Sequence, residues 1–248
     1  MIRSRSARFA ILAASLSLTA LAQTYKVPRT ADGKPDLQGI WEARNSAAGG
    51  LEAHSGSLGI HAGPSVIVDP ADGKIPYLPA AAAKRDENFR LRATKDPFNK
   101  CFLPGVPRLM YLPHPFQIFQ TPSHVAIASE YNHTTRTIYM QGSHYAEGEW
   151  WMGDSRGKWV GDTLVVDVSD FNADTWLDMS GNFHSEQLRV VERYTRTGPE
   201  TLQYEATLTD PKVFARPWTI RMPLYLRKDA QLYEYECSVY LDDEKKKK

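Results

Sequence analysis

The second half of the chain, from about Phe116 onward, alternates apolar and polar residues with a period of two. Such alternation is typical of β-strands that bury one face and expose the other. Because short turn-forming segments separate the runs, the pattern favours an antiparallel up-and-down meander. The predicted strands cover residues 124–131, 136–140, 163–168, 188–195, 201–209, 218–226 and 233–239, with shorter ones near Ile118 and Ile40.

These strands predict an all-β fold, as a lipocalin-like barrel of about eight strands that is closed or partly closed. Closure removes the exposed edges that an open sheet would leave. A barrel of this size holds packed side chains or one small ligand. A β-sandwich is the alternative that the alternation does not exclude.

Residues 23–115 differ from the second half, and we expect an irregular N-terminal segment that packs on the barrel. Turn chemistry recurs at 31–36 and 69–73, where Gly accepts positive φ and Pro presets φ. One helix is predicted at 79–93, because Pro79 suits a first turn and four alanines follow it. The barrel core is expected at 116–242 and a basic tail at 243–248.

Residues 1–22 have the pattern of a cleaved secretory signal peptide. Arg3, Arg5 and Arg8 precede an apolar run at 9–21, and Ala20 and Ala22 form a small-x-small cleavage pattern. The run is shorter than the roughly 20 apolar residues that cross a bilayer. We therefore expect export to the periplasm or the extracellular space. No later segment suggests a membrane span.

The charge balance argues against a nucleic-acid partner. The chain carries 30 Lys and Arg against 29 Asp and Glu. Setting aside the arginines of the leader and the terminal run Lys245–Lys248 leaves a mildly acidic body without a basic stripe. The lysine run is interpreted as a solvated tail.

Two cysteines, Cys101 and Cys237, lie far apart in the sequence. In an oxidising compartment they predict one disulfide between the segment before the first clear strand and the end of the last one. Two separate buried thiols are the alternative. A zinc site is not suggested by two cysteines at this spacing.

Several short motifs lie along the second half of the chain, namely GDSRGKWVGDTLVV at 153–166, GNFHSE at 181–186, VER at 191–193, DP at 210–211, PW at 217–218 and EYEC at 234–237. Together they resemble those of a family of secreted proteins from soil bacteria. The resemblance covers roughly residues 24–240. It implies export and a β-rich fold, and it brings no activity with it.

Two histidines are candidate catalytic residues. His144 and His184 are predicted on loops next to strand ends, which would let them converge at one mouth of the barrel. A neutral imidazole suits a general base or a metal ligand near pH 7, and Asp154 or Glu186 could orient one ring. The alternative is that each histidine caps a loop or bonds a backbone carbonyl. No His-x-His or His-x3-His spacing indicates a metal site, so none is expected.

Four charged residues lie within or beside predicted strands. Glu130 and Arg136 flank one predicted turn and could face each other, whereas Glu192 and Arg193 are neighbours on a later strand. Charges that point into a barrel are costly unless they are paired or hydrated. Inward placement would make Glu130 or Glu192 a catalytic carboxylate and an arginine the group that holds the ligand. Outward placement would leave ordinary surface ion pairs.

The window 153–157 fits the pattern Gly-x-Ser-x-Gly, but a nucleophile elbow requires a strand-to-helix turn. A β-turn with positive φ at Gly157 is the preferred interpretation. Trp151 and Trp176 are predicted near loops and could line a pocket for an aromatic or sugar-like ligand. Core or rim packing is the alternative for both indoles.

The sequence thus favours an exported barrel that binds a small, partly aromatic molecule in its cavity. The first alternative is a cofactor-independent lyase, isomerase or hydrolase, in which a histidine moves a proton. The second is a structural or interaction protein of the cell envelope. No cofactor is expected, since no glycine-rich phosphate loop connects a strand to a helix. The sequence leaves the oligomeric state open.

Overall fold

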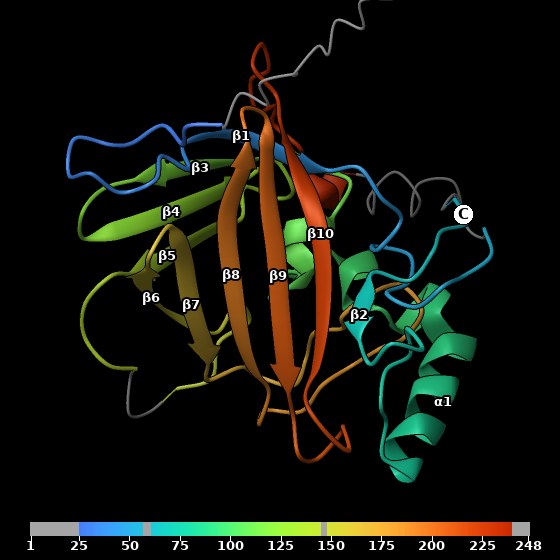
Figure 1. Ribbon diagram of the computed structural model, residues 1–248. Helices are drawn as coiled ribbons and strands as arrows, with labels where there is room; N and C mark the ends of the chain where they lie inside the picture. Colours follow the sequence, from blue (N-terminus) through green and yellow to red (C-terminus); the bar gives the residue numbers. More distant parts are fainter. Residues whose placement is uncertain (1–24, 57–60, 145–147, 240–248) are drawn as a thin grey trace, which may run out of the picture.

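The computed structural model describes residues 25–56, 61–144 and 148–239, so the expected leader at 1–22 and basic tail at 243–248 lie outside the described residues. The predicted closed β-barrel is confirmed, with nine strands in its wall (Figure 1). In spatial order these strands are β1 (Gly39–Ala43), β3 (Phe116–Gln120), β4 (His124–Ser129), β5 (Thr135–Tyr139), β6 (Asp154–Val160), β7 (Thr163–Ser169), β8 (Arg189–Gly198), β9 (Thr201–Thr209) and β10 (Trp218–Leu226).

Strand β1 from the N-terminal third closes the barrel. It pairs with β3 on one side, and at Trp41–Ala43 it pairs with the end of β10 on the other. The first half of that β10 edge is occupied by β2 (Ile67–Asp69), which lies outside the barrel. The N-terminal segment therefore supplies a wall strand as well as packing on the barrel.

Side chains fill the barrel interior. Alternate residues of most wall strands are buried, as in β9, where Tyr204 is 0% exposed. Burying a large apolar side chain contributes about 1.5–3 kcal/mol, which makes the interior the main source of stability. Large aromatic residues dominate this core, among them Trp41, Phe116, Tyr194, Tyr204 and Trp218.

The wall has one parallel seam, between β5 and β6. Only two residue pairs join these strands, Ile138 with Ser155 and Tyr139 with Arg156. The other neighbouring strands of the wall run antiparallel, so the prediction of a purely antiparallel meander is wrong at this point. A parallel pair needs a crossover connection, and the chain between β5 and β6 supplies it.

The window 153–157 opens strand β6, so its interpretation as a turn is wrong. Positive φ occurs at Gly153 and Gly161 on either side of the strand, but not at Gly157. Gly157 is needed for another reason, because a Cβ there would lie 2.7 Å from the sulfur of Met140. The close approach of the crossover connection explains the glycine.

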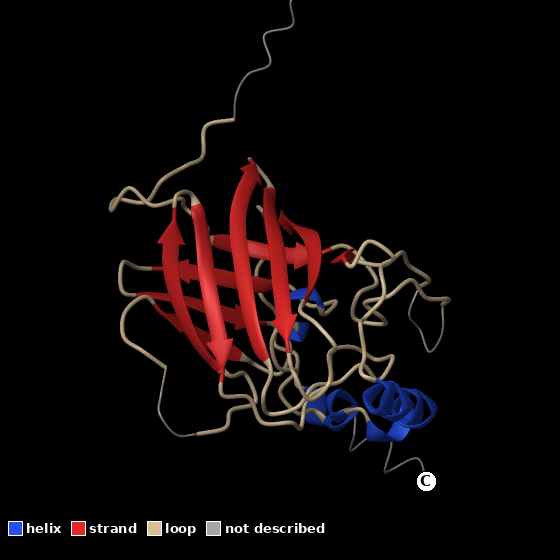
Figure 2. Cartoon of the chain, turned by 60° about the horizontal axis from the view of Figure 1, so that its bottom comes forward, coloured by secondary structure: helices blue, strands red, loops and turns tan. Residues whose placement is uncertain are grey.

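The N-terminal segment carries the predicted helix, α1 (Pro79–Lys95), and two short 3-10 helices, η1 (Pro97–Lys100) and η2 (Arg108–Tyr111). Helix α1 lies outside the barrel, on the side where β2 pairs with β10 (Figure 2). Loops that connect the strands gather between α1 and the barrel.

The predicted strand at 233–239 is wrong. Tyr235 makes one isolated bridge to Tyr131, and residues 237–239 are helical. Both edges of β10 are already occupied, so no edge of that strand remains for a further one.

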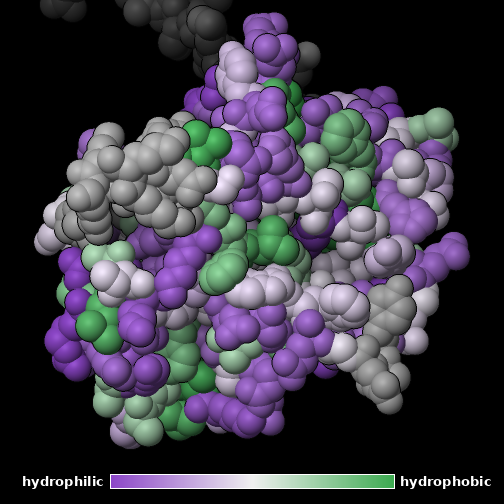
Figure 3. Space-filling model, turned by 180° about the vertical axis from the view of Figure 1, so that it is seen from behind, coloured by the Kyte–Doolittle hydropathy of each residue, from purple (hydrophilic) through white to green (hydrophobic). Residues whose placement is uncertain are grey.

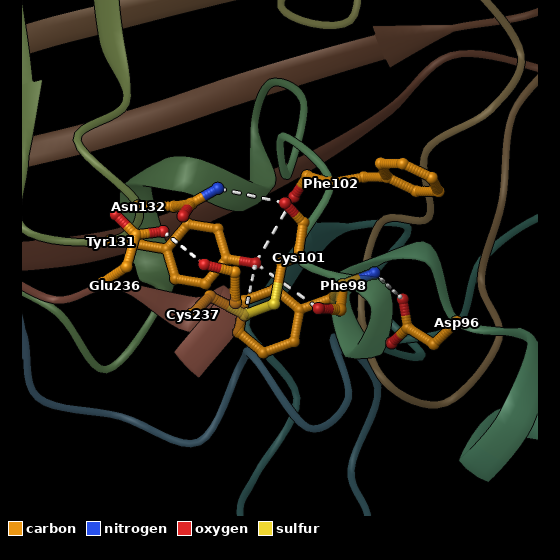
Figure 4. Close-up of a disulfide and its surroundings, with 9 residues drawn as sticks. Asp96, Phe98, Cys101, Phe102, Tyr131, Asn132, Glu236 and Cys237 are labelled. Carbon is orange, nitrogen blue, oxygen red and sulfur yellow. Dashed lines mark hydrogen bonds between the residues drawn. A yellow bond between two sulfur atoms is a disulfide. The ribbon is translucent and has the colours of Figure 1, made fainter. Parts of the chain in front are cut away.

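The predicted disulfide between Cys101 and Cys237 is present, with an S–S distance of 2.01 Å (Figure 4). It attaches the C-terminal segment to the end of η1. The phenol of Tyr131 lies against the bridge, and its hydroxyl donates to the carbonyl of Phe102 at 3.3 Å. The side-chain amide of Asn132 donates to the carbonyl of Cys101 at 3.0 Å, and its backbone N–H donates to the carbonyl of Tyr235 at 3.1 Å, so hydrogen bonds hold the chain near both ends of this crosslink.

Within the described part of the chain, no helix combines the length and the apolar character that crossing a membrane requires. On the face seen in Figure 3, apolar side chains form separate small patches among hydrophilic ones.

Candidate functional site

An open pocket of about 610 Å³ lies over the parallel seam, and we call it the seam pocket. Strands β5 and β6 pair only from Ile138 and Ser155 onward, so the wall is unpaired at the preceding residues of both strands. The pocket occupies this unpaired region. It is lined by Leu103, Thr135, Arg136, Thr137, Tyr139, Glu149, Trp150, Trp151, Met152, Gly153, Asp154 and Ser155.

A buried ion pair lies at the inner end of the pocket. Arg136 on β5 donates to both carboxylate oxygens of Glu192 on β8, with an Nη1–Oε1 distance of 3.1 Å. The side chains of Arg136 and Glu192 are 1% and 0% exposed. Tyr194 and Tyr204 also donate to Oε1 of Glu192, at 2.9 and 2.8 Å. The carboxylate is thus bound by three side chains, as a buried charge requires.

This arrangement fixes the charge state of the cluster. Burial by itself would lower the pKa of Arg136, but the neighbouring Glu192 outweighs it, and the pKa lies above its ordinary value. Burial raises the pKa of Tyr194 and Tyr204 well above the ordinary value, so both phenols stay protonated and act as donors. The predicted inward carboxylate is therefore Glu192, and its partner is Arg136.

Ser155 connects this cluster to the pocket. Its hydroxyl oxygen accepts a hydrogen bond from Nε of Arg136 at 3.0 Å. The hydroxyl proton of Ser155 has no acceptor among the described residues. Because a cation donates to the same oxygen, this O–H is polarised and becomes a stronger donor. The pocket thus has a buried hydrogen-bond donor at its inner end.

His144 lies in a cluster of aspartates next to the pocket. Its Nδ1 is 3.0 Å from Oδ2 of Asp154 and 3.9 Å from Oδ2 of Asp170, and its Nε2 is 3.6 Å from Oδ2 of Asp167. Each ring nitrogen therefore faces a carboxylate. Asp154 itself lines the seam pocket, so it links the imidazole to that site.

Ligand atoms of His144, Asp154 and Asp170 lie within 4.8 Å of one another and could hold a metal ion. Two guanidinium groups already compensate the charge of this cluster. Arg156 donates to Asp154 at 2.9 Å, and Arg189 donates to Asp167 at 2.7 Å. The hydrogen bond from Arg189 is the main cause of the lowered pKa of Asp167.

His184 lies in a different, fully buried network. Its Nδ1 is 2.8 Å from the carbonyl oxygen of Ser185, and its Nε2 is 2.6 Å from Oγ1 of Thr175. A carbonyl only accepts, so Nδ1 carries the proton and Thr175 donates to Nε2. Burial lowers the pKa of His184, which keeps the ring neutral. No hydrogen bond joins it to His144 in the described ranges, and the geometry is that of a loop-bonding histidine.

Three other candidates lie away from the seam pocket. Glu130 is partly exposed and accepts from the backbone N–H of Tyr233 at 3.4 Å, so it does not face Arg136. Arg193 is exposed on the outer side of β8. Glu186 forms a surface ion pair with Lys212.

The two candidate indoles have different environments. Trp151 lines the seam pocket and packs on Phe102, with ring centroids 5.0 Å apart. Trp176 is 9% exposed and lies in a separate pocket beside α1. The structure therefore brings Arg136, Glu192, Asp154, Trp151 and His144 to one region of the wall.

Sequence reasoning missed Asp178, a carboxyl group in a loop that accepts several hydrogen bonds. It is fully buried and accepts from the backbone N–H groups of Leu51, Ser180 and Asn182 at 2.8, 2.9 and 3.2 Å. Burial raises its pKa to about 6. Its nearby sequence, Asp-Met-Ser-Gly-Asn, is typical of a turn, but it contains no signal for the distant partner Leu51.

No protein-family model, no curated protein and no solved structure matches this chain.

Proposed function

We propose that the protein binds a small, partly aromatic molecule that bears a hydrogen-bond acceptor, and that the seam pocket is its binding site. The seam pocket is the observation that supports this function, because it combines indole surfaces with one buried, polarised O–H donor. Ligand sites typically have this composition, with apolar walls and a few fixed polar groups.

The aromatic walls suit a planar ligand. Trp150 is 47% exposed, and Trp151 is held by its contact with Phe102. Tyr139 is likewise fixed, since the guanidinium of Arg156 lies 4.8 Å from its ring centroid. Rigid aromatic side chains lose little conformational entropy on binding, and stacking contributes beyond the buried area.

The inner end of the pocket favours a neutral acceptor such as a carbonyl oxygen. Glu192 already neutralises Arg136, so a fully charged ligand would gain little from that guanidinium. The Ser155 O–H would donate to the ligand acceptor, and the hydroxyls of Thr135 and Thr137 lie on the same pocket lining. Hydroxyl donors of this kind select for orientation.

We also propose that the protein is exported to the periplasm or beyond. The predicted signal peptide and the family resemblance support this, as does the disulfide, since such bonds persist in oxidising compartments. In the described part of the chain, no specific contact favours the third possibility, an envelope interaction protein.

A cofactor-independent enzyme is the second candidate function. One observation favours it: Asp154 lines the pocket and contacts Nδ1 of His144 at 3.0 Å. A carboxylate–imidazole pair of this kind can hold or move a proton. In this candidate, the pair would transfer a proton to or from a ligand bound in the seam pocket.

Titration of intrinsic tryptophan fluorescence with a panel of aromatic ketones, aldehydes and carboxylic acids tests the binding proposal. Trp151→Ala and Ser155→Ala are each expected to raise the Kd of a bound compound at least tenfold. Phe119→Ala, an exposed aromatic on β3 outside the pocket, is the control and should leave the Kd unchanged. The proposal would be overturned if Trp151→Ala and Ser155→Ala bound a compound as tightly as the control Phe119→Ala, or if no compound of the panel bound at all.

The same compounds separate the two candidates. The enzyme candidate is supported if the protein converts one of these compounds over time, and if His144→Gln stops the conversion but binds the compound with an unchanged Kd. Binding without conversion supports carriage.

A further inference from the structure

A second pocket, of about 340 Å³, lies between α1 and the loop that precedes β2, and we call it the helix pocket. It shares no lining residue with the seam pocket. Its most polar lining residues come from three separate segments, with Arg85 and Arg92 on α1, His54 on the loop, and Ser180 and Asn182 on the chain between β7 and β8.

One face of α1 builds the cationic side of this pocket. Arg85, Phe89 and Arg92 follow one another at spacings of four and three, which places them on a single helical face. The guanidinium of Arg92 lies 4.0 Å from the ring centroid of Phe89, and its Nη1 donates to the carbonyl of Phe89 at 2.6 Å. The position of Arg92 is therefore fixed, and the described residues supply no acceptor for its other side-chain N–H groups.

Two polar atoms of the lining are shielded from solvent without a partner among the described residues. They are Nε of Arg85 and Nε2 of His54. The one ion pair of Arg85 in the described structure is with Asp86, at 3.4 Å, and both side chains there are substantially exposed. A buried donor or acceptor without a partner is destabilising, so a polar ligand that satisfies these atoms would stabilise the pocket.

The hydrogen bonding of His54 indicates what it would accept. Its Nδ1 is 2.9 Å from the carbonyl oxygen of Glu52, and this geometry assigns the ring proton to Nδ1. Nε2 then has a lone pair and needs a donor. A ligand that satisfies both unpartnered atoms must therefore accept from a guanidinium and donate to an imidazole.

The walls of the helix pocket are preorganised. The buried carboxyl of Asp178 accepts from Leu51, next to the glycines of the lining, and from Ser180 on the opposite wall, at 2.8 and 2.9 Å. Glu52 is the acidic residue of the lining, but its Oε1 accepts from the backbone of Ile75 at 2.8 Å. The lining thus contains two arginines and one carboxylate, so its net charge is positive.

We propose that the helix pocket binds a phosphoryl group, as free phosphate or as a small phosphate monoester. The phosphoryl oxygens accept from Arg85 and Arg92, whose guanidinium groups match tetrahedral oxyanions well. A protonated phosphate oxygen donates to Nε2 of His54. Sulfate has the same shape and no proton to donate near neutral pH, so the site discriminates against it.

Isothermal titration of the full chain with inorganic phosphate, phenyl phosphate and sulfate tests this site at pH 6, where about half of a phosphate monoester keeps one proton and sulfate has none. One phosphate per chain is expected to bind, with sulfate at least tenfold weaker. Tighter binding of phenyl phosphate than of phosphate would identify a monoester as the ligand, whereas tighter phosphate would identify the free ion. Sulfate binding as tightly as phosphate, or no heat from either phosphate compound, would overturn the proposal.

Variants of α1 provide matched controls. Arg85→Gln and Arg92→Gln should each weaken phosphate binding at least tenfold, and Arg85→Lys should restore part of the loss. Arg90→Gln removes the same charge from an exposed position of the same helix that does not line the pocket. An equal loss in Arg90→Gln would show nonspecific attraction and would overturn the site. Unchanged circular dichroism separates these effects from unfolding.

Discussion

Arg136 and Glu192 meet inside the barrel from strands β5 and β8, which are separated in the wall by β6 and β7. Removing one partner of such a pair leaves the other charge buried and unpaired, which costs about 3–5 kcal/mol. We therefore expect Glu192→Gln to lower the free energy of unfolding by that amount, measured by urea denaturation.

The neighbouring position is the control for this prediction. Arg193→Gln removes a charge from the exposed side of the same strand, and surface substitutions usually change stability by less than about 0.5 kcal/mol. If both substitutions lower the free energy of unfolding by the same amount, the buried ion pair has no special role in the stability of the interior.

Reducing the disulfide is expected to lower stability by roughly 5 kcal/mol. The residues that it joins are 136 positions apart, and in the chain-entropy model the stabilisation grows with the length of the closed loop. The double variant Cys101→Ser, Cys237→Ser should unfold at the same urea concentration as the reduced natural chain. A double variant as stable as the oxidised chain would contradict this expectation.

The carboxyl of Asp178 should give stability a pH dependence of unusual sign. Its pKa in the folded state is about 6, above the ordinary 3.8, so its contribution is fully present below pH 3.8 and is lost as the pH rises through 6. The loss is on the order of 3 kcal/mol. The unfolding free energy of the natural chain, measured relative to Asp178→Asn, should therefore fall between pH 4 and pH 7.

Asp174→Asn, at an exposed position in the same segment, is the reference for that measurement. It should retain the pH dependence of the natural chain. Identical pH slopes in the natural chain and both variants would refute the assignment to Asp178.

His184 should act in the opposite direction. Burial lowers its pKa in the folded state below the ordinary 6.5, so its contribution is present above pH 6.5 and is lost as the pH falls through the folded value. His184→Gln should flatten the acid limb of the stability profile below pH 6.5. The exposed His124→Gln should not, and a flattened limb in that control would argue against burial as the cause.

Local pattern was sufficient to predict most of the barrel. Strands β7, β9 and β10 begin and end within a residue or so of the predicted bounds, because alternation reports which face of a strand is buried. The pattern does not report which strand lies alongside. The parallel pairing of β5 with β6 and the insertion of β1 between β3 and β10 depend on contacts between distant segments.

For the candidate site too, local pattern predicts which side of a strand a residue is on, but not which distant residue it contacts. Glu192 shares its side of β8 with Val190, so its inward direction could be inferred from the strand. Its partner could not, because Arg136 lies 56 positions away, and only the curvature of the closed wall brings the two together. His144 and His184 have similar sequence surroundings, yet burial separates them into an aspartate cluster and a loop-bonding network.

The position of β1 has a consequence for assembly. The first wall strand of the chain fills the last gap of the barrel, between β3 and β10, so the ring cannot be completed until both halves of the polypeptide are available. Deleting residues 25–43 would expose two unsatisfied backbone edges, one on each side of the same opening. A second molecule that donates its own Gly39–Ala43 would fit that opening, and the shortened protein should therefore exchange segments with intact copies.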